Sequence, residues 1–287
     1  MRQQQASLQT DLCRKGLWQS GRVPLPEGAL DFLGQVKVAG TLRTSPDLPL
    51  LAWLTERWRQ DRDASGFVDF TLYEVGAAIY GRKPGGAENA RLRAALRRLW
   101  AVTVDVDGWT PSGGYGDRNR LGTWTRLVEL VEWSDGLNEP ATAGQLRGDT
   151  FRAKLGPWVI ERVRAGHITY LDWETLRALY GLAQRLWVYL AAERFDPAPK
   201  NPDEEKTWIK LGDRAYAALG MNYAQDRQAR AAINRAGAAI CAVDKRYQSV
   251  AVERRPGGWA IIAARIRSRE RAAIRAAVRA SLGSVDA

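Results

Sequence analysis

The sequence predicts an α+β fold built from two similar units, each of which runs strand, helix, tight turn, helix, strand. In the first unit, residues 67–70 alternate like a short strand and residues 71–80 have helical spacing that ends at Gly81. A second helix is predicted over residues 87–99, and residues 102–107 alternate again as a strand. This order of elements is typical of a helix-turn-helix unit.

The second unit repeats this order. Residues 208–211 open it as a strand, residues 212–219 form a helix that stops at Gly220, and residues 224–240 have helical spacing. Residues 248–253 and 259–265 then alternate on either side of an Arg-Arg-Pro-Gly-Gly turn, which predicts a β-hairpin with a basic tip. A helix-turn-helix followed by such a hairpin is a winged helix. We therefore expect two tandem winged-helix domains.

The outer faces of the two second helices carry Arg and small residues. Leu92, Leu96 and Leu99 form the apolar stripe of the first, and Ala87 and Ala90 lie roughly opposite. Small residues let a helix enter a DNA major groove, where Arg can contact guanine or phosphate. An ordinary amphipathic helix with a solvated Arg face would explain either helix alone. The presence of such a basic, small-residue face in both units favours DNA binding, with the two helices in major grooves about one helical turn apart.

The candidate DNA contacts fall into two sets. Side chains expected on or near bases are Arg97, Arg98, Arg227, Gln228, Asn234 and Arg235. Side chains expected on phosphates are Arg82, Lys83, Arg118, Arg120, Lys245, Arg246, Arg254 and Arg255. The same two helices add Arg91, Arg93 and Arg230 to the candidate surface.

The expected domains are an N-terminal arm over residues 1–40, a first winged-helix domain over 41–149 including a Gly- and Pro-containing linker, a second over 150–266, and a basic C-terminal helical tail over 267–287. Within the arm, residues 1–22 are expected to be flexible and residues 36–38 to form a short strand. The tail packs on the second domain, binds phosphate or stays free in solution; the sequence leaves these three options open.

The remaining segments are assigned by their periodicity. Helices are expected over residues 48–62, 150–166 (around the Gly156-Pro157 interruption), 175–180 and 182–195; a strand over 123–133; a charged loop over 196–206; and a long wing or a disordered loop over 107–122. Five tryptophans lie at apolar-periodic positions and are expected in the core: Trp53, Trp58, Trp100, Trp187 and Trp208.

Composition indicates a polyanionic partner. Lys and Arg number 43 against 32 Asp and Glu, which gives a net charge of +11, and nucleic acid is the first candidate for such a chain. No apolar run is long enough to span a membrane, and residues 1–14 lack the apolar core of a secretory signal. Cys13 and Cys241 are the only cysteines, so we expect a cytoplasmic protein without disulfides.

The sequence contains few of the residues and motifs that common catalytic sites need. His167 is the only histidine, which excludes the paired-His metal site of rolling-circle initiators and relaxases in its usual form. The chain has no P-loop motif and too few cysteines for a zinc site. We therefore expect no enzyme activity, no metal and no cofactor. The carboxylates at Asp61, Asp63, Asp69, Asp105 and Asp107 leave a metal-dependent nuclease or primase as the minor alternative.

Three segments resemble the plasmid replication initiator protein A family. They are Thr41-Leu42-Arg43-Thr44-Ser45-Pro46-Asp47 before an apolar helix; the run from Arg91 to Val104 followed by Gly108-Trp109; and the run from Ala165 to Asp172 continued by Leu179 and Ala183-Gln184-Arg185-Leu186-Trp187-Val188-Tyr189-Leu190. The resemblance covers roughly residues 40 to 265. Trp187 stands where a Tyr would be expected, and the Arg-rich tail has no counterpart.

The resemblance implies a tandem winged-helix protein that binds repeated origin sequences of a plasmid in double-stranded DNA. Such a protein opens the origin or recruits host replication proteins, exchanges between monomers and homodimers, and often represses its own promoter. If one unit serves dimerisation, we expect it to be the first, because Asp69, Glu74 and Glu88 make its DNA face less cleanly basic. A winged-helix transcriptional regulator without origin function is the competing class.

Overall fold

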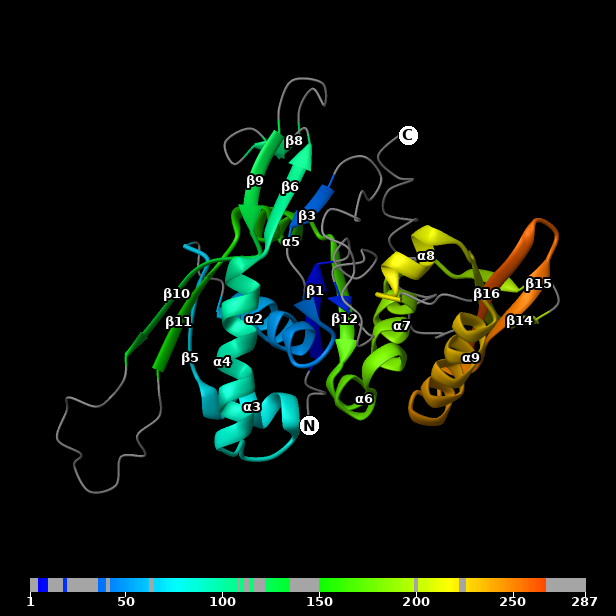
Figure 1. The fold of residues 1–287 in the computed structure, drawn as a ribbon, viewed down its shortest axis with the longest axis horizontal. Coiled ribbons are helices and arrows are strands. Elements are labelled where there is room, and N and C mark those ends of the chain that lie inside the picture. The colour runs from blue at the N-terminus through cyan, green and yellow to red at the C-terminus, as the bar shows by residue number, and fades with distance from the viewer. Residues whose placement is uncertain are drawn as a thin grey trace, which may run out of the picture.

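Two groups of helices, each packed beside antiparallel strands, lie side by side in the protein (Figure 1). The computed structural model describes residues 5–9, 18–19, 36–39, 42–61, 65–107, 109–110, 114–115, 122–134, 150–198, 201–221 and 226–266. The predicted α+β class is confirmed: the described strands form six small open sheets and the described helices pack against them. No described helix has the length and apolar character needed to cross a membrane.

The first group follows the predicted order of elements. It consists of α2 (Asp47–Asp61), β5 (Phe67–Thr71), α3 (Leu72–Tyr80), α4 (Gly86–Ala101) and β6 (Thr103–Asp107). A capping box starts α3: the Glu74 amide donates to the Thr71 hydroxyl over 3.1 Å, and the Thr71 amide donates to the Glu74 carboxylate over 2.7 Å. Gly81 ends the helix with a left-handed φ of 70°.

Two three-stranded antiparallel sheets accompany these helices. One has the order β3-β6-β9, where β3 is Val36–Ala39 and β9 is Gly122–Arg126. The other has the order β10-β11-β5, where β10 is Val128–Ser134 and β11 is Thr150–Leu155. The predicted strands over residues 36–38 and 123–133 are thus confirmed, the second broken at Leu127. The short antiparallel strands β7 (Trp109–Thr110) and β8 (Gly114–Tyr115) pair within residues 107–122, where the sequence allowed either a long wing or a disordered loop.

The helix predicted from residue 150 is wrong at its start. Phe151, Ala153 and Leu155 are buried and alternate with less buried neighbours, which is the pattern of a strand, and Phe151 stacks on Phe70 with ring centroids 5.7 Å apart. The helix α5 begins only at Pro157, a residue suited to a first helical turn, and ends at Arg164. The β5–β11 pairing crosses the domain boundary expected between residues 149 and 150.

The flexible arm expected over residues 1–22 is also wrong in part. Strand β1 (Gln5–Gln9) pairs antiparallel with β12 (Ile168–Asp172), so the backbone of the arm is hydrogen-bonded to the strand that opens the second group. Strand β2 (Trp18–Gln19) pairs with β4 (Leu42–Arg43). The tail over residues 267–287 lies outside the described residues.

The second group contains α6 (Trp173–Ala178), α7 (Gly181–Ala192), α8 (Asp213–Ala218) and α9 (Asp226–Val243). Its sheet has the order β13-β14-β16-β15, from strands β13 (Asp196–Ala198), β14 (Asn201–Lys210), β15 (Tyr247–Arg255) and β16 (Gly258–Ile266). The predicted hairpin over residues 248–265 is confirmed. The charged loop expected over 196–206 is wrong, because its charges pair across strands: Arg265 on β16 lies 3.0 Å from Glu205 on β14.

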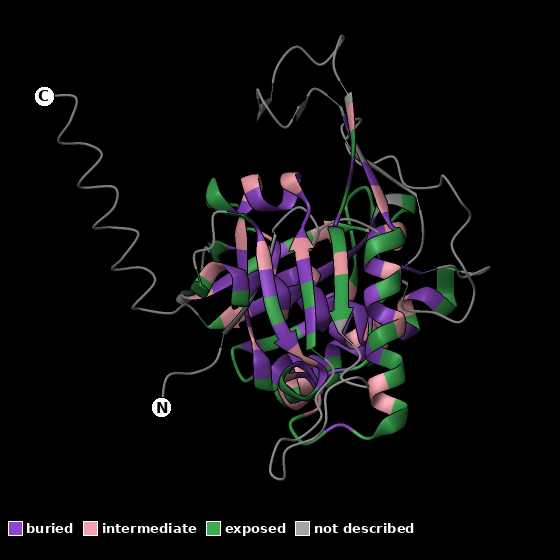
Figure 2. Cartoon of the chain, turned by 90° about the vertical axis from the view of Figure 1, so that its left-hand side faces the viewer, coloured by how far each residue is buried: buried purple, intermediate pink, exposed green. Residues whose placement is uncertain are grey.

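One hydrophobic core runs through both groups. It extends from Leu42 to Ala263 and gathers where helices meet strands, while exposed residues line the outer faces (Figure 2). Trp53 packs against this core, and Trp58 and Trp187 lie within it, as predicted. The prediction was wrong for Trp100 and Trp208, which are 43% and 70% exposed. Both residues lie near the ends of their elements: Trp100 is in the last turn of α4, with the Arg126 guanidinium against its ring, and Trp208 is two residues before the end of β14.

Candidate nucleic-acid interface

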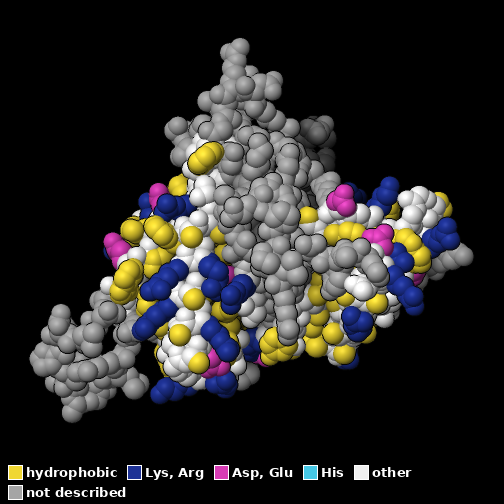
Figure 3. Space-filling view, in the orientation of Figure 1, with side chains coloured by type: hydrophobic (Ala, Val, Ile, Leu, Met, Phe, Trp, Pro, Cys, Tyr) yellow, Lys and Arg dark blue, Asp and Glu magenta, His cyan; other side chains and the backbone are white. Residues whose placement is uncertain are grey.

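Helix α4 presents the basic face expected from its sequence. Leu92, Leu96 and Leu99 are buried, so the opposite side of the helix faces outward. Arg91, Arg93 and Arg97 are exposed there, beside the exposed small residues Ala87 and Ala90. In Figure 3 the Lys and Arg side chains gather over this helix.

The turn before α4 is held by one carboxylate. The Glu88 carboxylate accepts a hydrogen bond from the Gly85 amide over 2.8 Å and forms an ion pair with Arg82 over 2.6 Å. The Gly85 amide, followed by the Arg82 guanidinium, lowers the pKa of Glu88 below its ordinary value. Arg82 thus helps to shape the turn although 65% of its side chain is exposed, and Lys83 beside it is exposed.

Arg98 has a different place from the other arginines of α4. Its guanidinium donates to both carboxylate oxygens of Asp47, at 2.7 and 2.6 Å, and only 25% of its side chain is exposed. Asp47 is fully buried at the start of α2, where it also accepts the Arg43 amide over 2.8 Å. The hydrogen bonds to Asp47 raise the pKa of Arg98. This ion pair ties Arg98 to the fold, so we remove it from the expected base contacts.

Helix α9 presents the second face. Arg227, Gln228 and Arg235 are exposed, whereas Ala229, Ile233 and Ile240 are buried against the sheet and α7. Arg230 is half-buried, with its guanidinium 4.4 Å from the centre of the Trp259 ring on β16. This contact joins the first turns of α9 to the hairpin close to its tip, because Trp259 pairs with Arg254 beside the turn.

Two residues fix the spacing between α9 and β15. The side-chain oxygen of Asn234 accepts the Val252 amide over 2.7 Å, so this residue joins the helix to the hairpin and its oxygen is committed to that bond. A Cβ atom on Gly237 would lie 2.0 Å from the Val250 carbonyl oxygen, which means that only glycine allows this approach. The sequence expected Asn234 on a base; the structure gives it a positioning contact.

The hairpin β15–β16 has a basic tip. Arg254 and Arg255 are exposed beside the Pro256-Gly257 turn, and Arg255 lies 3.1 Å from Glu253. Lys245 is exposed at the end of α9. We call this hairpin with its tip the wing. Figure 3 shows Lys and Arg side chains at this end of the molecule on the same side as those of α4.

Arg246 pairs with a buried carboxylate at the base of the wing. Its guanidinium lies 2.6 Å from Asp244, which also accepts the Trp187 indole N–H over 2.8 Å. Burial alone would raise the pKa of Asp244, but the bonds from Arg246 and Trp187 outweigh it and lower that pKa. Asp244 thus links α7 to the turn between α9 and β15, with Arg246 paired to it, and the outer part of Arg246, at 51% exposure, remains for a phosphate.

Among the described residues, no group of three or more His, Cys, Asp or Glu side chains could hold a metal. His167 is exposed in the turn before β12. Asp69 faces Arg152 over 3.4 Å and Asp61 faces Arg57 over 3.0 Å, which are surface ion pairs. Arg118 and Arg120, expected on phosphates, lie outside the described part of the chain.

The sequence did not reveal an apolar groove beside the basic face of α4. Trp100, Leu130 and Trp133 are exposed around it, and Leu96, Val131 and Phe151 also line it. The sequence feature that could have indicated this groove is the interrupted alternation of residues 123–133, which places large apolar residues on both faces of a strand.

These elements define an α+β protein with open sheets and two exposed basic helices. No family model and no curated protein matches the chain. Among solved structures, the selenomethionine derivative of domains 2 and 3 of RctB aligns with a TM-score of 0.54, over 90% of this chain and 98% of that chain, at 11% identity. Another crystal structure of RctB domains 2–3 aligns with a TM-score of 0.48 over 83% and 89%, also at 11% identity. The first alignment shows that the protein shares the fold of those RctB domains.

Proposed function

We propose that this protein is a sequence-specific, double-stranded DNA-binding replication initiator with two tandem winged-helix units. The observation that carries the proposal is the unit made of α8, α9 and the wing. Its sheet order β14-β16-β15 supports a winged helix, one face of its second helix is exposed and basic, and its hairpin tip is basic. A strand, two helices and a hairpin in this order place a helix and a wing on one DNA face.

The first unit supports the same proposal through its residues. The motif that ends at Asp47 and the motif that contains Arg98 both carry the resemblance to plasmid initiators, and an ion pair between Arg98 and the buried Asp47 carboxylate joins them. Asp172, from the third such segment, caps α6 by accepting the Thr175 amide over 2.8 Å. Residues that carry the resemblance therefore hold the fold together, and we extend the family's origin-binding role to this chain on that basis.

The proposed DNA contacts follow from exposure. Arg97 on α4 and Arg227, Gln228 and Arg235 on α9 are assigned to bases or their immediate surroundings. Side chains assigned to phosphates are the exposed Arg82, Lys83, Arg91, Arg93, Lys245, Arg246, Arg254 and Arg255, together with the half-buried Arg230. We propose that the protein acts without enzyme activity or cofactor, that the sites are repeats in a plasmid origin, and that a homodimer and host replication proteins take part.

A selection for preferred duplex DNA, with binding measured at two salt concentrations and without metal, tests the proposal. We expect a repeated site, and we expect Arg235→Ala to weaken binding to that site by about tenfold while binding to random duplex changes little. Arg194→Ala, an exposed arginine paired with Asp196 beyond α7, is the matched control. Salt-sensitive binding without any preferred sequence would refute the assignment of α9 to bases.

A second experiment separates an initiator from a transcriptional regulator. Supercoiled plasmid carrying the selected repeats is incubated with the protein, and unpaired bases are mapped chemically. An initiator should open a segment beside the repeats, and the same repeats should support replication of a plasmid in cells that supply the protein. Binding without opening and without replication would leave a regulator as the better description.

A further inference from the structure

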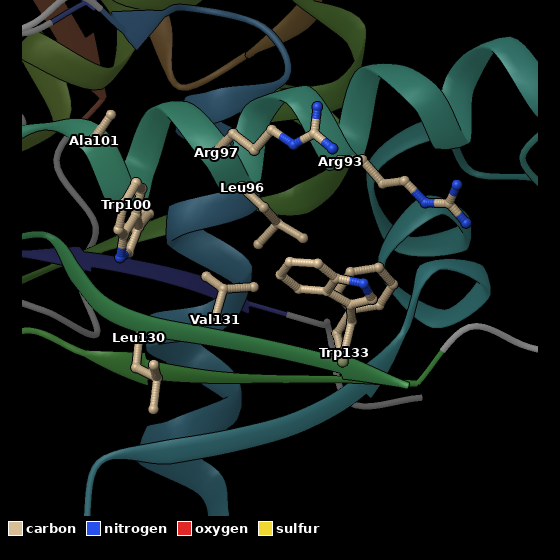
Figure 4. A pocket seen from close by; sticks show the side chains of 9 residues that line it. Arg93, Leu96, Arg97, Trp100, Ala101, Leu130, Val131 and Trp133 are labelled. Carbon is tan, nitrogen blue, oxygen red and sulfur yellow. The ribbon is translucent and has the colours of Figure 1, made fainter. Parts of the chain in front are cut away.

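An apolar groove lies between α4 and β10, next to the basic face of α4. It has a volume of about 670 Å³. In Figure 4, Leu96 and Trp100 of α4 face Val131 and Trp133 of β10 across it, and Arg93 and Arg97 extend from α4 at its edge. Trp133 is 61% exposed and Leu130 is 37% exposed, although both are large apolar side chains. We call this hollow the α4–β10 groove.

The chemistry of the groove specifies its occupant. The floor is made of aliphatic and aromatic side chains, with Leu96 and Phe151 almost fully buried beneath it. The edge is cationic, because Arg93 and Arg97 lie on α4 and the Arg126 guanidinium lies 4.5 Å from the centre of the Trp100 ring. An occupant that matches both features has a row of apolar side chains flanked by carboxylates.

Nucleobases match these features less well. One face of the Trp100 ring is already covered by Arg126, which leaves less of that indole for stacking. Leu, Val, Phe and Ala side chains make up most of the floor, so the polar edges of a buried base would lose their hydrogen bonds to water without replacement. Apolar side chains of a protein segment lose nothing of this kind. A volume of about 670 Å³ also exceeds what one base fills.

We propose that the α4–β10 groove docks an acidic amphipathic helix of a partner protein. The helix would place apolar residues at positions i, i+3 or i+4, and i+7 on Leu96, Trp100, Leu130, Val131 and Trp133, and its Glu or Asp residues would face Arg93 and Arg97. This surface is separate from α9 and the wing. Because Arg93 and Arg97 also belong to the proposed DNA face of α4, the docked helix and duplex DNA would compete for the first unit while α9 stays available.

The first test uses the full-length protein without DNA. The probe is a fluorescein-labelled, helix-forming peptide with Leu at every third or fourth position and Glu on both flanks, and its binding is followed by fluorescence polarisation. We expect Trp133→Ser to weaken binding by about tenfold or more, which is the effect of losing one large apolar anchor. Trp208→Ser, which removes a 70% exposed indole on β14, is the matched control and should leave binding unchanged.

A charge exchange separates docking from general stickiness. Arg97→Glu should weaken binding of the acidic peptide. It should strengthen binding of an otherwise identical peptide in which Lys replaces Glu. Equal binding of both peptides to the unaltered protein, or a Trp133→Ser variant that binds as well as the parent, would overturn the proposal. So would an oligo(dT) strand that binds more tightly than the peptide and depends on Trp133, because the groove would then be a nucleic-acid site. Circular dichroism of each variant checks that the fold is retained.

Discussion

The ion pair between Arg98 and Asp47 can be tested against the exposed arginine beside it. Arg98→Met keeps most of the aliphatic side chain but leaves the Asp47 carboxylate, which is fully buried, without its two bonds of 2.7 and 2.6 Å. Removing one partner of a buried ion pair costs about 3–5 kcal/mol of unfolding free energy. Because a quarter of the Arg98 side chain is exposed and Asp47 keeps the Arg43 amide, we expect about 3 kcal/mol.

Urea denaturation followed by circular dichroism measures this effect. Arg97→Met, one position earlier on the exposed face, should change the unfolding free energy by about 0.5 kcal/mol or less. The double variant Asp47→Asn with Arg98→Met should lose less than the sum of the two single variants, because both act on one interaction. Equal destabilisation by Arg98→Met and Arg97→Met would refute the reasoning. Under native conditions Arg98→Met should keep its DNA sequence preference, whereas Arg97→Ala should weaken it.

Three further predictions concern the second unit. Gly237→Ala should destabilise the protein by about 1–3 kcal/mol in urea denaturation, because its Cβ atom would meet the β15 backbone, whereas Gly212→Ala, which has open space, should change it by about 0.5 kcal/mol or less. Asn234→Ala should cost about 0.5–1.5 kcal/mol and speed hydrogen exchange at the Val252 amide, and unchanged exchange there would contradict the positioning role. Burial raises the pKa of Tyr247 from 10.0 to about 12. The stability that this side chain contributes is therefore fully present below pH 10 and is lost as the pH rises through 12, a loss of about 2–3 kcal/mol. When the unfolding free energy is measured across that range, this loss should disappear in Tyr247→Phe.

Local signals in the sequence located the elements that carry the proposed function. The Leu92, Leu96 and Leu99 stripe placed α4 correctly because a helix buries one face at its own period, and Gly81 marked the end of α3 because glycine adopts the left-handed conformation without strain. The basic hairpin was predicted from alternation on either side of a Pro-Gly-Gly turn. These features depend on neighbours within a few residues.

Features that depend on distant residues were missed. On a helical wheel Arg98 differs little from Arg97, and only the fold brings it to Asp47, which lies 51 residues earlier. Asn234 likewise finds its partner 18 residues later, on a different element. Residues 150–155 alternate over too short a stretch to outweigh the helical spacing after them, and their strand is fixed by pairing with β5. The α4–β10 groove arises from two segments whose separate patterns say nothing about the space between them.

The pairing of β1 with β12 has a consequence for the order in which the chain assembles. Gln5 faces Asp172 and Gln9 faces Ile168, so β1 is synthesised more than 150 residues before the strand with which it pairs. Closing so long a loop has a high entropic cost, and this contact should therefore form late and be among the first to open. Until it forms, β12 presents an unpaired edge, onto which the β1 strand of a neighbouring copy fits with the same hydrogen bonds. The topology therefore allows β1 to be exchanged between two copies of the chain through the same antiparallel pairing.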